Sequence, residues 1–424
     1  MKKTLVALAA LAATSVFAQS SVTISGNVDL GMRTLDENGV VIGRPANATA
    51  TGALVNRKQS GPIGNGATGW SSSALGLDIK EELGGGVTAG YSVAIDLNSW
   101  AATNDTGAGT NQYFQNTRHS FAFLGDSKMG EVRVGYQYTL DDQIQGGIGR
   151  ATPTGNIVGR VQNTAFTMNP TQAAQTAAAP YREGYEKIDS GSFTRNNALQ
   201  YATPVMSGFQ GLVQWAQQTN DSTVAAQTPD GRATGAVTAV AGKYSSGPLN
   251  LGASYTTVKA LATTINNAGS EFETKTTMTD FAANYDFGAA KVFANMFSRK
   301  TDVTTGADYD GAVANYNATT QYGAFANGGD LKRTGWDLGA SVPFGKATVF
   351  ASVGNGKNNY SFTRGANQAE VKIKANLIGV TYDFSKRTSL NAYMGSAKAT
   401  SDDLFATSVE LKRTHTGFGL RHQF

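Results

Sequence analysis

The sequence contains no cysteine and only three histidines among its 424 residues. The missing cysteines exclude a disulfide framework, thiolate zinc sites and a cysteine nucleophile. Long apolar runs are missing as well, because no stretch approaches the ~18 consecutive apolar residues of a membrane-spanning helix. The hydrophobic fraction of 40% and the mean hydropathy of -0.25 would suit a water-soluble chain. A strand that alternates between lipid and water, however, erases its own hydropathy signal.

Charge is nearly balanced, with 35 basic and 31 acidic side chains. So small an excess gives no support to nucleic-acid binding. Two of the lysines, Lys2 and Lys3, precede the short apolar run Leu5–Ala13 and the small-residue pattern Val16-Phe17-Ala18. This order is typical of a secretory signal peptide. We expect residues 1–18 to be removed, residues 19–424 to form one barrel domain, and the protein to be exported.

Period-two alternation of apolar and polar residues dominates the rest of the chain. From Ser20, for example, Val22, Ile24, Val28 and Leu30 share one face of a strand. About sixteen such segments predict an all-β fold, a transmembrane antiparallel barrel with an even strand number. They are Ser20–Arg33, Ser73–Leu83, Val87–Asn98, Asn116–Leu124, Glu131–Tyr138, Asn197–Thr203, Phe209–Gln217, Ala236–Tyr244, Leu249–Val258, Thr277–Phe287, Lys291–Arg299, Thr334–Val342, Ala347–Val353, Val371–Phe384, Ser389–Ser396 and Thr414–Phe424.

The connections between these segments alternate in length, which is typical of outer-membrane barrels with short periplasmic turns and long external loops. Tight turns are expected at Gly84–Gly86, Gly125–Gly130, Ser245–Pro248, Gly288–Ala290, Phe344–Lys346 and Ser385–Thr388. Two tracts, Asp36–Gly69 and Leu140–Thr194, are far longer than usual connections and are expected to be functional or disordered loops.

Two segments depart from the pattern. In Val371–Phe384 the apolar parity switches between Leu377 and Ile378, which predicts a β-bulge or a misplaced strand boundary. The segment Lys291–Arg299 carries apolar residues on both faces, so its orientation stays open.

Five motifs resemble the general porins of β-proteobacteria, and the likeness extends from Gln19 to Phe424 with divergent loops. The motifs are Gln19–Asp29, Glu82–Gly86, Gly130–Gly135, Arg195–Tyr201 with Thr203-Pro204, and Gly419–Phe424. The resemblance implies a trimer of sixteen-stranded barrels whose third external loop, here Leu140–Thr194, folds into the lumen and narrows it. It also implies a ladder of arginines opposite that loop.

Arg118 and Arg195 match ladder positions of this family, whereas Ala74 and Tyr136 stand where the family usually has arginine. The third loop carries Arg150, Arg160, Arg182 and Lys187 against Asp141, Asp142, Glu183, Glu186 and Asp189. We therefore expect a weaker anion preference than the family's.

Alternation places Arg118 with Ser120 and Ala122 on the lumen face, and His119, Phe121 and Phe123 on the lipid face. An arginine facing lipid near the midplane would cost ~2–4 kcal/mol. Lys80 and Arg133 are candidates for the constriction by the same argument, with wall charges as the alternative. Strict alternation turns Arg195 outward, so a pore role would need a bulge or a loop position, and binding a carbonyl at the rim is the alternative.

Other residues have plainer interpretations. Tyr91, Tyr136, Tyr138, Trp215, Tyr255, Tyr285, Trp336 and Tyr382 lie on the apolar parity near strand ends and suit interfacial girdles. A sugar-stacking track would need aromatics on the lumen face, where only Tyr393 is expected. Asp141-Asp142 and Asp402-Asp403 could bind a divalent cation, but solvated loop charge is favoured.

The sequence thus predicts an outer-membrane porin for passive diffusion of small hydrophilic solutes and ions, with a substrate-selective channel of the same fold as the alternative. We expect no enzymatic activity, cofactor or metal, because no catalytic constellation is found. Expected partners are two further copies of the chain, outer-membrane lipid, lipopolysaccharide and the outer-membrane assembly machinery. Phe424, the last aromatic residue of the final strand, is the candidate assembly signal.

Overall fold

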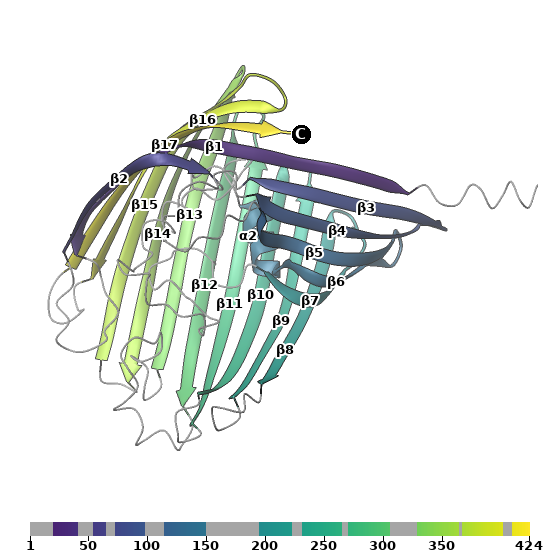
Figure 1. Cartoon of the computed structure of the whole chain (residues 1–424), viewed down its shortest axis with the longest axis horizontal. Coiled ribbons are helices and arrows are strands. Elements are labelled where there is room, and N and C mark those ends of the chain that lie inside the picture. Colours follow the sequence, from purple (N-terminus) through teal and green to yellow (C-terminus); the bar gives the residue numbers. More distant parts are fainter. Residues whose placement is uncertain are drawn as a thin grey trace, which may run out of the picture.

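A computed structural model describes residues 20–40, 54–64, 73–97, 114–149, 195–222, 231–264, 270–305, 329–363, 367–401 and 409–424. These ranges contain strands and one helix (Figure 1). The elements are β1 (Ser21–Val40), β2 (Leu54–Gly64), β3 (Ala74–Gly84), β4 (Val87–Leu97), β5 (Phe114–Asp126), β6 (Gly130–Tyr138), α2 (Leu140–Ile148), β7 (Arg195–Ala202), β8 (Phe209–Ser222), β9 (Gly231–Ser246), β10 (Leu249–Thr264), β11 (Ser270–Asp286), β12 (Lys291–Thr305), β13 (Gly329–Phe344), β14 (Ala347–Thr363), β15 (Asn367–Asp383), β16 (Thr388–Ser401) and β17 (Val409–Gln423).

The strands form one closed antiparallel barrel. From β3 to β17 each strand pairs with the next in the chain, and β17 closes the sheet against β1. The other edge of β1 is shared, because Ser21–Asn27 pairs with β3 and Leu30–Val40 pairs with β2. A sixteen-stranded wall results, as expected, and closure leaves no open sheet edge in lipid. The sequence interpretation was wrong about residues 54–64, which form β2 rather than part of a loop.

The six predicted tight turns join β3–β4, β5–β6, β9–β10, β11–β12, β13–β14 and β15–β16. A seventh turn, between β7 and β8, is held by paired backbone hydrogen bonds between Met206 and Phe209. Ser207 has a φ of 50° there, followed by Gly208 at 87°. This turn was not predicted, because a left-handed serine gives no sequence signal as clear as glycine does.

The two faces of the wall differ in polarity. Large apolar side chains are exposed on the outer face, among them Trp215, Tyr255, Trp336 and Ile378 at 41–51%. Of the eight predicted girdle residues, Tyr91, Trp215, Tyr255, Tyr285, Trp336 and Tyr382 are exposed, while Tyr136 and Tyr138 are half-buried. The inner face buries polar groups and holds α2 against β8–β11. An apolar exterior around a polar interior is the arrangement that a strand wall needs in a bilayer.

The parity switch in β15 is not a bulge. The ladder runs without interruption through Leu377 and Ile378 on both sides, opposite Ser352 and Ala351 on β14. Toward the long-loop end the exposed outer side chains are Lys372 and Lys374, while Val371 and Ile373 point inward and are buried. The strand therefore continues beyond the lipid, where its outer face meets water and the apolar side chains lie inside.

The predicted parity of β5 is also wrong. Phe121 lies opposite Ser92, and Phe123 lies opposite Gly90, both on the inner face of β4. His119 points inward too, because its Nε2 is 2.9 Å from the Ser92 hydroxyl. Leu124, on the other face, is 54% exposed. The inward rings had been assigned to the lipid face because apolar residues were expected there.

Several aromatic rings lie over glycines of the neighbouring strand. Phe350 faces Gly379, and Tyr393 faces Gly417. A Cβ added at Gly379 would lie 2.2 Å from the Phe350 ring, and one at Gly417 would lie 2.6 Å from the Tyr393 ring. Tyr393 points inward as expected, but so do Phe350 and other aromatics, including Phe293 and Phe297. A ring that covers a glycine stabilises the wall, so the buried inner aromatics need no sugar-stacking role.

Candidate pore constriction

Helix α2, the first segment of the predicted third loop, packs on the inner wall. Leu140, Ile144 and Ile148 follow one another at intervals of four residues and therefore share one face of the helix. They are 0%, 0% and 9% exposed. Leu140 packs on Ala202, Leu212 and Ala239, whereas Ile144 and Ile148 pack on Ala282. Small side chains on the wall let the helix approach closely.

Polar groups of the wall bind the end of α2. The last carbonyls of a helix have no partner within the helix, and here the Asn284 amide donates to the Ile148 carbonyl at 2.7 Å. Likewise, the Asn295 amide donates to the Gly149 carbonyl at 2.6 Å. The helix is thus bound to β11 and β12 by directional contacts as well as by apolar packing.

A buried ion cluster fixes the start of α2. The Asp141 carboxylate lies 3.4 Å from the Arg299 guanidinium of β12, and the Asp280 carboxylate of β11 lies 3.9 Å from the same group. Gln145 of α2 donates to Asp280 at 2.5 Å. Burial raises the pKa of the Asp141 carboxyl, and the charge of Arg299 opposes this shift. The favoured interpretation of Asp141 as solvated loop charge was wrong, because its side chain is only 1% exposed. Asp142 beside it is half-buried.

Arg118 lies on the inner wall at β5 and pairs with Asp96 of β4 through its Nε. The ladder between the two strands skips one residue here, so that Ala94 faces His119 and Ile95 faces Thr117. This irregularity turns Arg118 toward the same side as its inward neighbour His119. The predicted lumen position is therefore reached through a bulge and not through strict alternation.

Ala74, where the family usually has arginine, lies directly opposite Asp96. The cation beside the Asp96 carboxylate is therefore Arg118 of β5 and not a residue at position 74 of β3. Tyr136, the other departure, lies opposite Ser120 of β5 and Asn197 of β7.

Arg133 and Lys80 both lie on the inner wall, nearer the tight turns. The Arg133 Nε is 2.5 Å from Glu131, and its guanidinium lies 4.9 Å from the centre of the Phe121 ring. Lys80 is 2.7 Å from Glu82 and its side chain is 50% exposed. Arg195 begins β7 opposite Tyr138, and its side chain lies outside the described part of the chain, as do Asp402 and Asp403. The wall thus brings Arg118, Arg133 and Lys80 onto one surface, each with a carboxylate partner.

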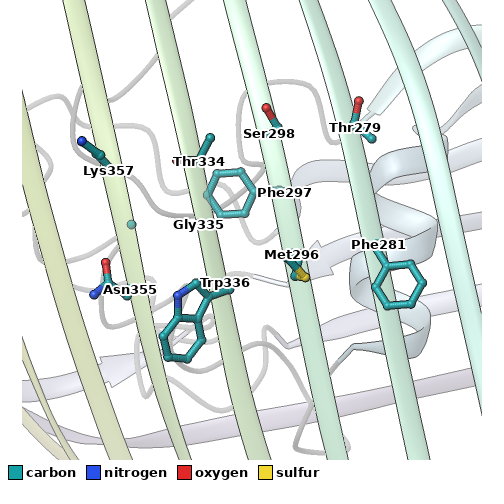
Figure 2. Close-up of a pocket in the computed structure, with 11 residues that line it drawn as sticks. Thr279, Phe281, Met296, Phe297, Ser298, Thr334, Gly335, Trp336, Asn355 and Lys357 are labelled. Atoms are coloured by element: carbon teal, nitrogen blue, oxygen red, sulfur yellow. The ribbon is translucent and has the colours of Figure 1, made fainter.

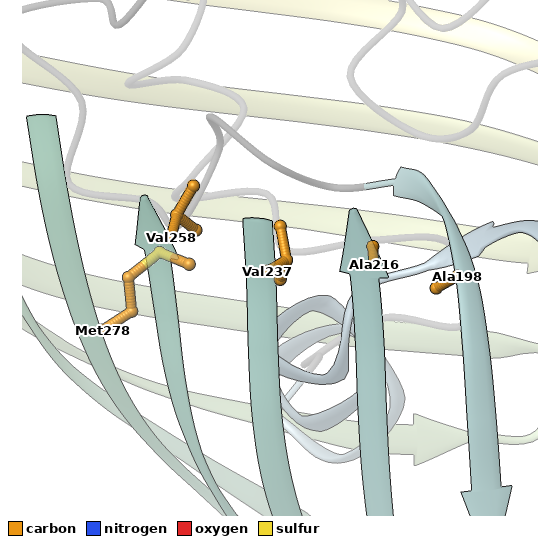
Figure 3. Packing of buried hydrophobic residues seen from close by; sticks show 5 residues of the cluster. All are labelled: Ala198, Ala216, Val237, Val258 and Met278. Atoms are coloured by element: carbon orange, nitrogen blue, oxygen red, sulfur yellow. The ribbon is translucent and has the colours of Figure 1, made fainter. Parts of the chain in front are cut away.

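Sequence reasoning missed the inner residues of the opposite wall. Arg299, Arg333, Arg413 and His415 are inward and at most 5% exposed. Arg299 and Arg333 are directly opposite each other on β12 and β13. Arg333 and Arg413 lay just outside the predicted strands, which had been begun too late at Thr334 and Thr414. Arg299 and His415 lay inside predicted strands, but the orientation of Lys291–Arg299 had stayed open and His415 had been given no pore role. A strip of buried apolar side chains crosses β7–β11 on the same inner face (Figure 3), namely Ala198, Ala216, Val237, Val258 and Met278.

Phe424 lies where the barrel closes. Its backbone N–H donates to the Gly26 carbonyl, and its carbonyl accepts from the Gly26 N–H, both at 3.0 Å. A Cβ at Gly26 would lie 2.4 Å from the Phe424 ring. The last residue therefore joins the two ends of the sheet.

A closed antiparallel barrel with an apolar exterior, polar interior and a helix against the inner wall defines a class, the channel-forming barrels of the bacterial outer membrane. The model of the Gram-negative porin family matches residues 4–402, and the chain belongs to this family. It is an integral porin of the outer membrane.

Two relatives and two solved structures agree with this assignment. The chain is 29% identical to an outer membrane porin protein of Bordetella pertussis and 28% identical to outer membrane porin protein 32 of Delftia acidovorans, with 100% of both chains covered in each case. OmpT of Vibrio cholerae in its trimer form is 12% identical with a TM-score of 0.52, covering 96% of this chain and 99% of that one. The channel DcaP of Acinetobacter baumannii is 11% identical with a TM-score of 0.53, covering 96% and 97%. The likeness to these structures concerns the fold alone, whereas the porin relatives are of the predicted β-proteobacterial type.

Proposed function

We propose that this porin is a water-filled channel for passive diffusion of small hydrophilic solutes and ions, with a weak preference for anions. One observation supports the sign. In two inner ion pairs of the described residues the cation is more exposed than its carboxylate. The exposed fractions are 22% against 13% for Arg118 and Asp96, and 34% against 31% for Arg133 and Glu131. At these two pairs a passing ion therefore meets slightly more cationic surface. The preference is weak because both cations are paired with a carboxylate.

The remaining features of the proposal concern assembly. Two further copies of the chain complete a homotrimer, and lipopolysaccharide and other outer-membrane lipids surround it. Residues 1–18 act as a cleaved signal peptide, and the assembly machinery reads the Phe424 end. The channel catalyses no reaction, as its family relatives are channels.

Reversal potentials in planar bilayers with asymmetric salt test the proposal. The wild-type channel should show a small reversal potential whose sign corresponds to anion selectivity. The exchange Asp96→Asn removes the negative charge beside Arg118 and should increase anion selectivity, since charges in a narrow path act with little screening. Glu81→Gln removes an equal charge from the outer face of β3 and should leave the potential unchanged. A strongly cation-selective wild-type channel would refute the proposal.

A substrate-selective channel of the same fold remains the second candidate, favoured by the altered arginine positions at Ala74 and Tyr136. It predicts conductance that saturates with, or is blocked by, one solute. Current traces recorded with a panel of small sugars, amino acids and organic acids separate the two functions.

A further inference from the structure

Three lysines form a straight row across the outer face of β15, β16 and β17. Lys374 lies directly opposite Lys398, and Lys398 lies directly opposite Lys412. The Cβ atoms of directly opposed residues are about 4.5–5.5 Å apart, and like charges in such pairs are destabilising. A second opposed pair, Lys357 and Lys372, lies beside the row on β14 and β15. We name these five residues the lysine patch.

Two carboxylates, Glu370 and Glu410, lie beside the lysine patch and neutralise only part of its charge. Glu410 lies 2.5 Å from Lys398 and 2.7 Å from Lys412. Glu370 pairs with Lys357 and lies 3.3 Å from Lys372. Among the described residues, these five lysines and two glutamates leave a net of three positive charges. The lysine side chains remain accessible, for instance 46% for Lys398 and 65% for Lys412.

Below the row, toward the tight turns, the surface becomes apolar in register. The next outward positions are Asn376, Ser396 and Thr414, where the Ser396 hydroxyl donates to Asn376 at 3.2 Å. Ile378 and Met394 follow, 51% and 55% exposed. The outer surface of these strands thus changes in three steps toward the tight turns. Lysines come first, hydroxyl and amide groups follow, and apolar side chains come last.

The height of the row matches the edge of the membrane. Lys374 is ten positions before Phe384, an exposed aromatic at the β15–β16 turn. At ~3.4 Å per position the two residues are about 34 Å apart along the strand. With a tilt of about 40° this becomes about 26 Å along the membrane normal, close to the ~25 Å apolar band of such barrels. The lysines therefore lie at the headgroups of the outer leaflet.

A shallow groove of about 490 Å³ continues this surface over β11–β14 (Figure 2). Phe281, Met296 and Trp336 line its lower part, and Lys357 lies at its upper end. Hydrocarbon below and a cation above suit a lipid whose chain lies in the groove and whose anionic headgroup is at the patch.

We infer that the lysine patch binds the phosphorylated headgroup of lipopolysaccharide, with acyl chains on the apolar wall beneath and in the adjoining groove. The inference rests on the proposed place of lipopolysaccharide around the channel and adds the residues that bind it. Phosphate groups supply the negative charge that opposed lysines need, and lysine binds phosphate as a point charge.

Titration of the detergent-solubilised full-length porin with purified lipopolysaccharide tests the inference. The variant Lys374→Gln/Lys398→Gln/Lys412→Gln should bind about 100-fold more weakly, since each lysine near an anionic surface contributes about a factor of five. The matched control Lys128→Gln/Lys346→Gln/Lys386→Gln removes the same charge from exposed positions in the tight turns and should bind like wild type. The charge-preserving variant Lys374→Arg/Lys398→Arg/Lys412→Arg should retain binding.

A second probe needs no variant. Dephosphorylated lipopolysaccharide should bind the wild-type porin as weakly as intact lipopolysaccharide binds the glutamine variant. Wild-type affinity in the glutamine variant, or equal wild-type affinity for both glycolipids, would overturn the inference. Conductance and reversal potential should be the same in all variants, because the patch lies outside the lumen. If the wild-type porin conducts normally but does not bind lipopolysaccharide, only this inference is refuted. If the wild-type porin shows no conductance, the proposed function is refuted.

Discussion

The docking of α2 depends on one missing side chain, at Gly252 on the inner face of β10. A Cβ at this position would lie 2.5 Å from Ile148 Cδ1 and 2.9 Å from Ile144 Cδ1. Both contacts are with ends of flexible side chains, so Gly252→Ala should cost about 1–3 kcal/mol of docking free energy as overpacking. Gly252→Leu cannot fit beneath the helix. Loss of the buried Ile144 and Ile148 side chains would then cost about 1.5–3 kcal/mol each.

A total of about 3–6 kcal/mol shifts the docking equilibrium by about 10²–10⁴-fold. We expect Gly252→Leu to raise single-channel conductance in planar bilayers, because α2 leaves the inner wall. The barrel should keep its heat-resistant migration on gels, since every strand ladder is intact. Ala253→Leu, on the exposed outer face of the same strand, is the control and should conduct like wild type. Wild-type conductance in a folded Gly252→Leu barrel would refute the reasoning that α2 obstructs the lumen.

Three further predictions follow from the inner wall and the barrel closure. Arg118→Glu changes the local charge by two units and should move the reversal potential toward cations; an unchanged potential would remove Arg118 from the selectivity filter. Excision of Thr152–Ala179 should raise conductance and relax the size limit with trimers intact, as measured by liposome swelling; unchanged permeability would place this segment outside the pore. Deletion of Phe424 removes two backbone hydrogen bonds to Gly26 and the assembly signal. Insertion in cells should therefore fall, with near-normal heat resistance of the inserted molecules, and full surface expression would contradict this.

The lipid-facing part of each strand was predictable because its physics is local. Residues such as Tyr382 and Leu420 are apolar because they face lipid. Their neighbours in the strand face the lumen and are often polar, so the sequence alternates. Outside the bilayer that rule ends. Lys372 and Lys374 face water on the outer surface, so the same strand reverses its pattern without any change of register. The predicted strands were therefore too short, and Arg333 and Arg413 lay outside them.

The candidate constriction was less predictable because it depends on contacts distant in sequence. Asp141 is charged and lies in a long loop, which favours a solvated position, yet Arg299 meets it across 158 residues. Likewise, Arg118 points inward only because the ladder between β5 and β4 is irregular. Phe123 points inward because its ring packs over Gly90 of β4, which has no side chain. A single sequence does not reveal such pairings.

The pairing of Phe350 with Gly379 has a consequence for how this protein can evolve. The Phe350 ring occupies the volume that any side chain at 379 would need. Only one of the two positions can therefore carry a large side chain. An enlargement at 379 requires that 350 has become small first. That order leaves only a bare patch of backbone between the two changes, whereas the reverse order produces a clash with the Phe350 ring. The permissible route between homologous sequences therefore has a direction, from the aromatic partner to the glycine, at each such pair around the wall.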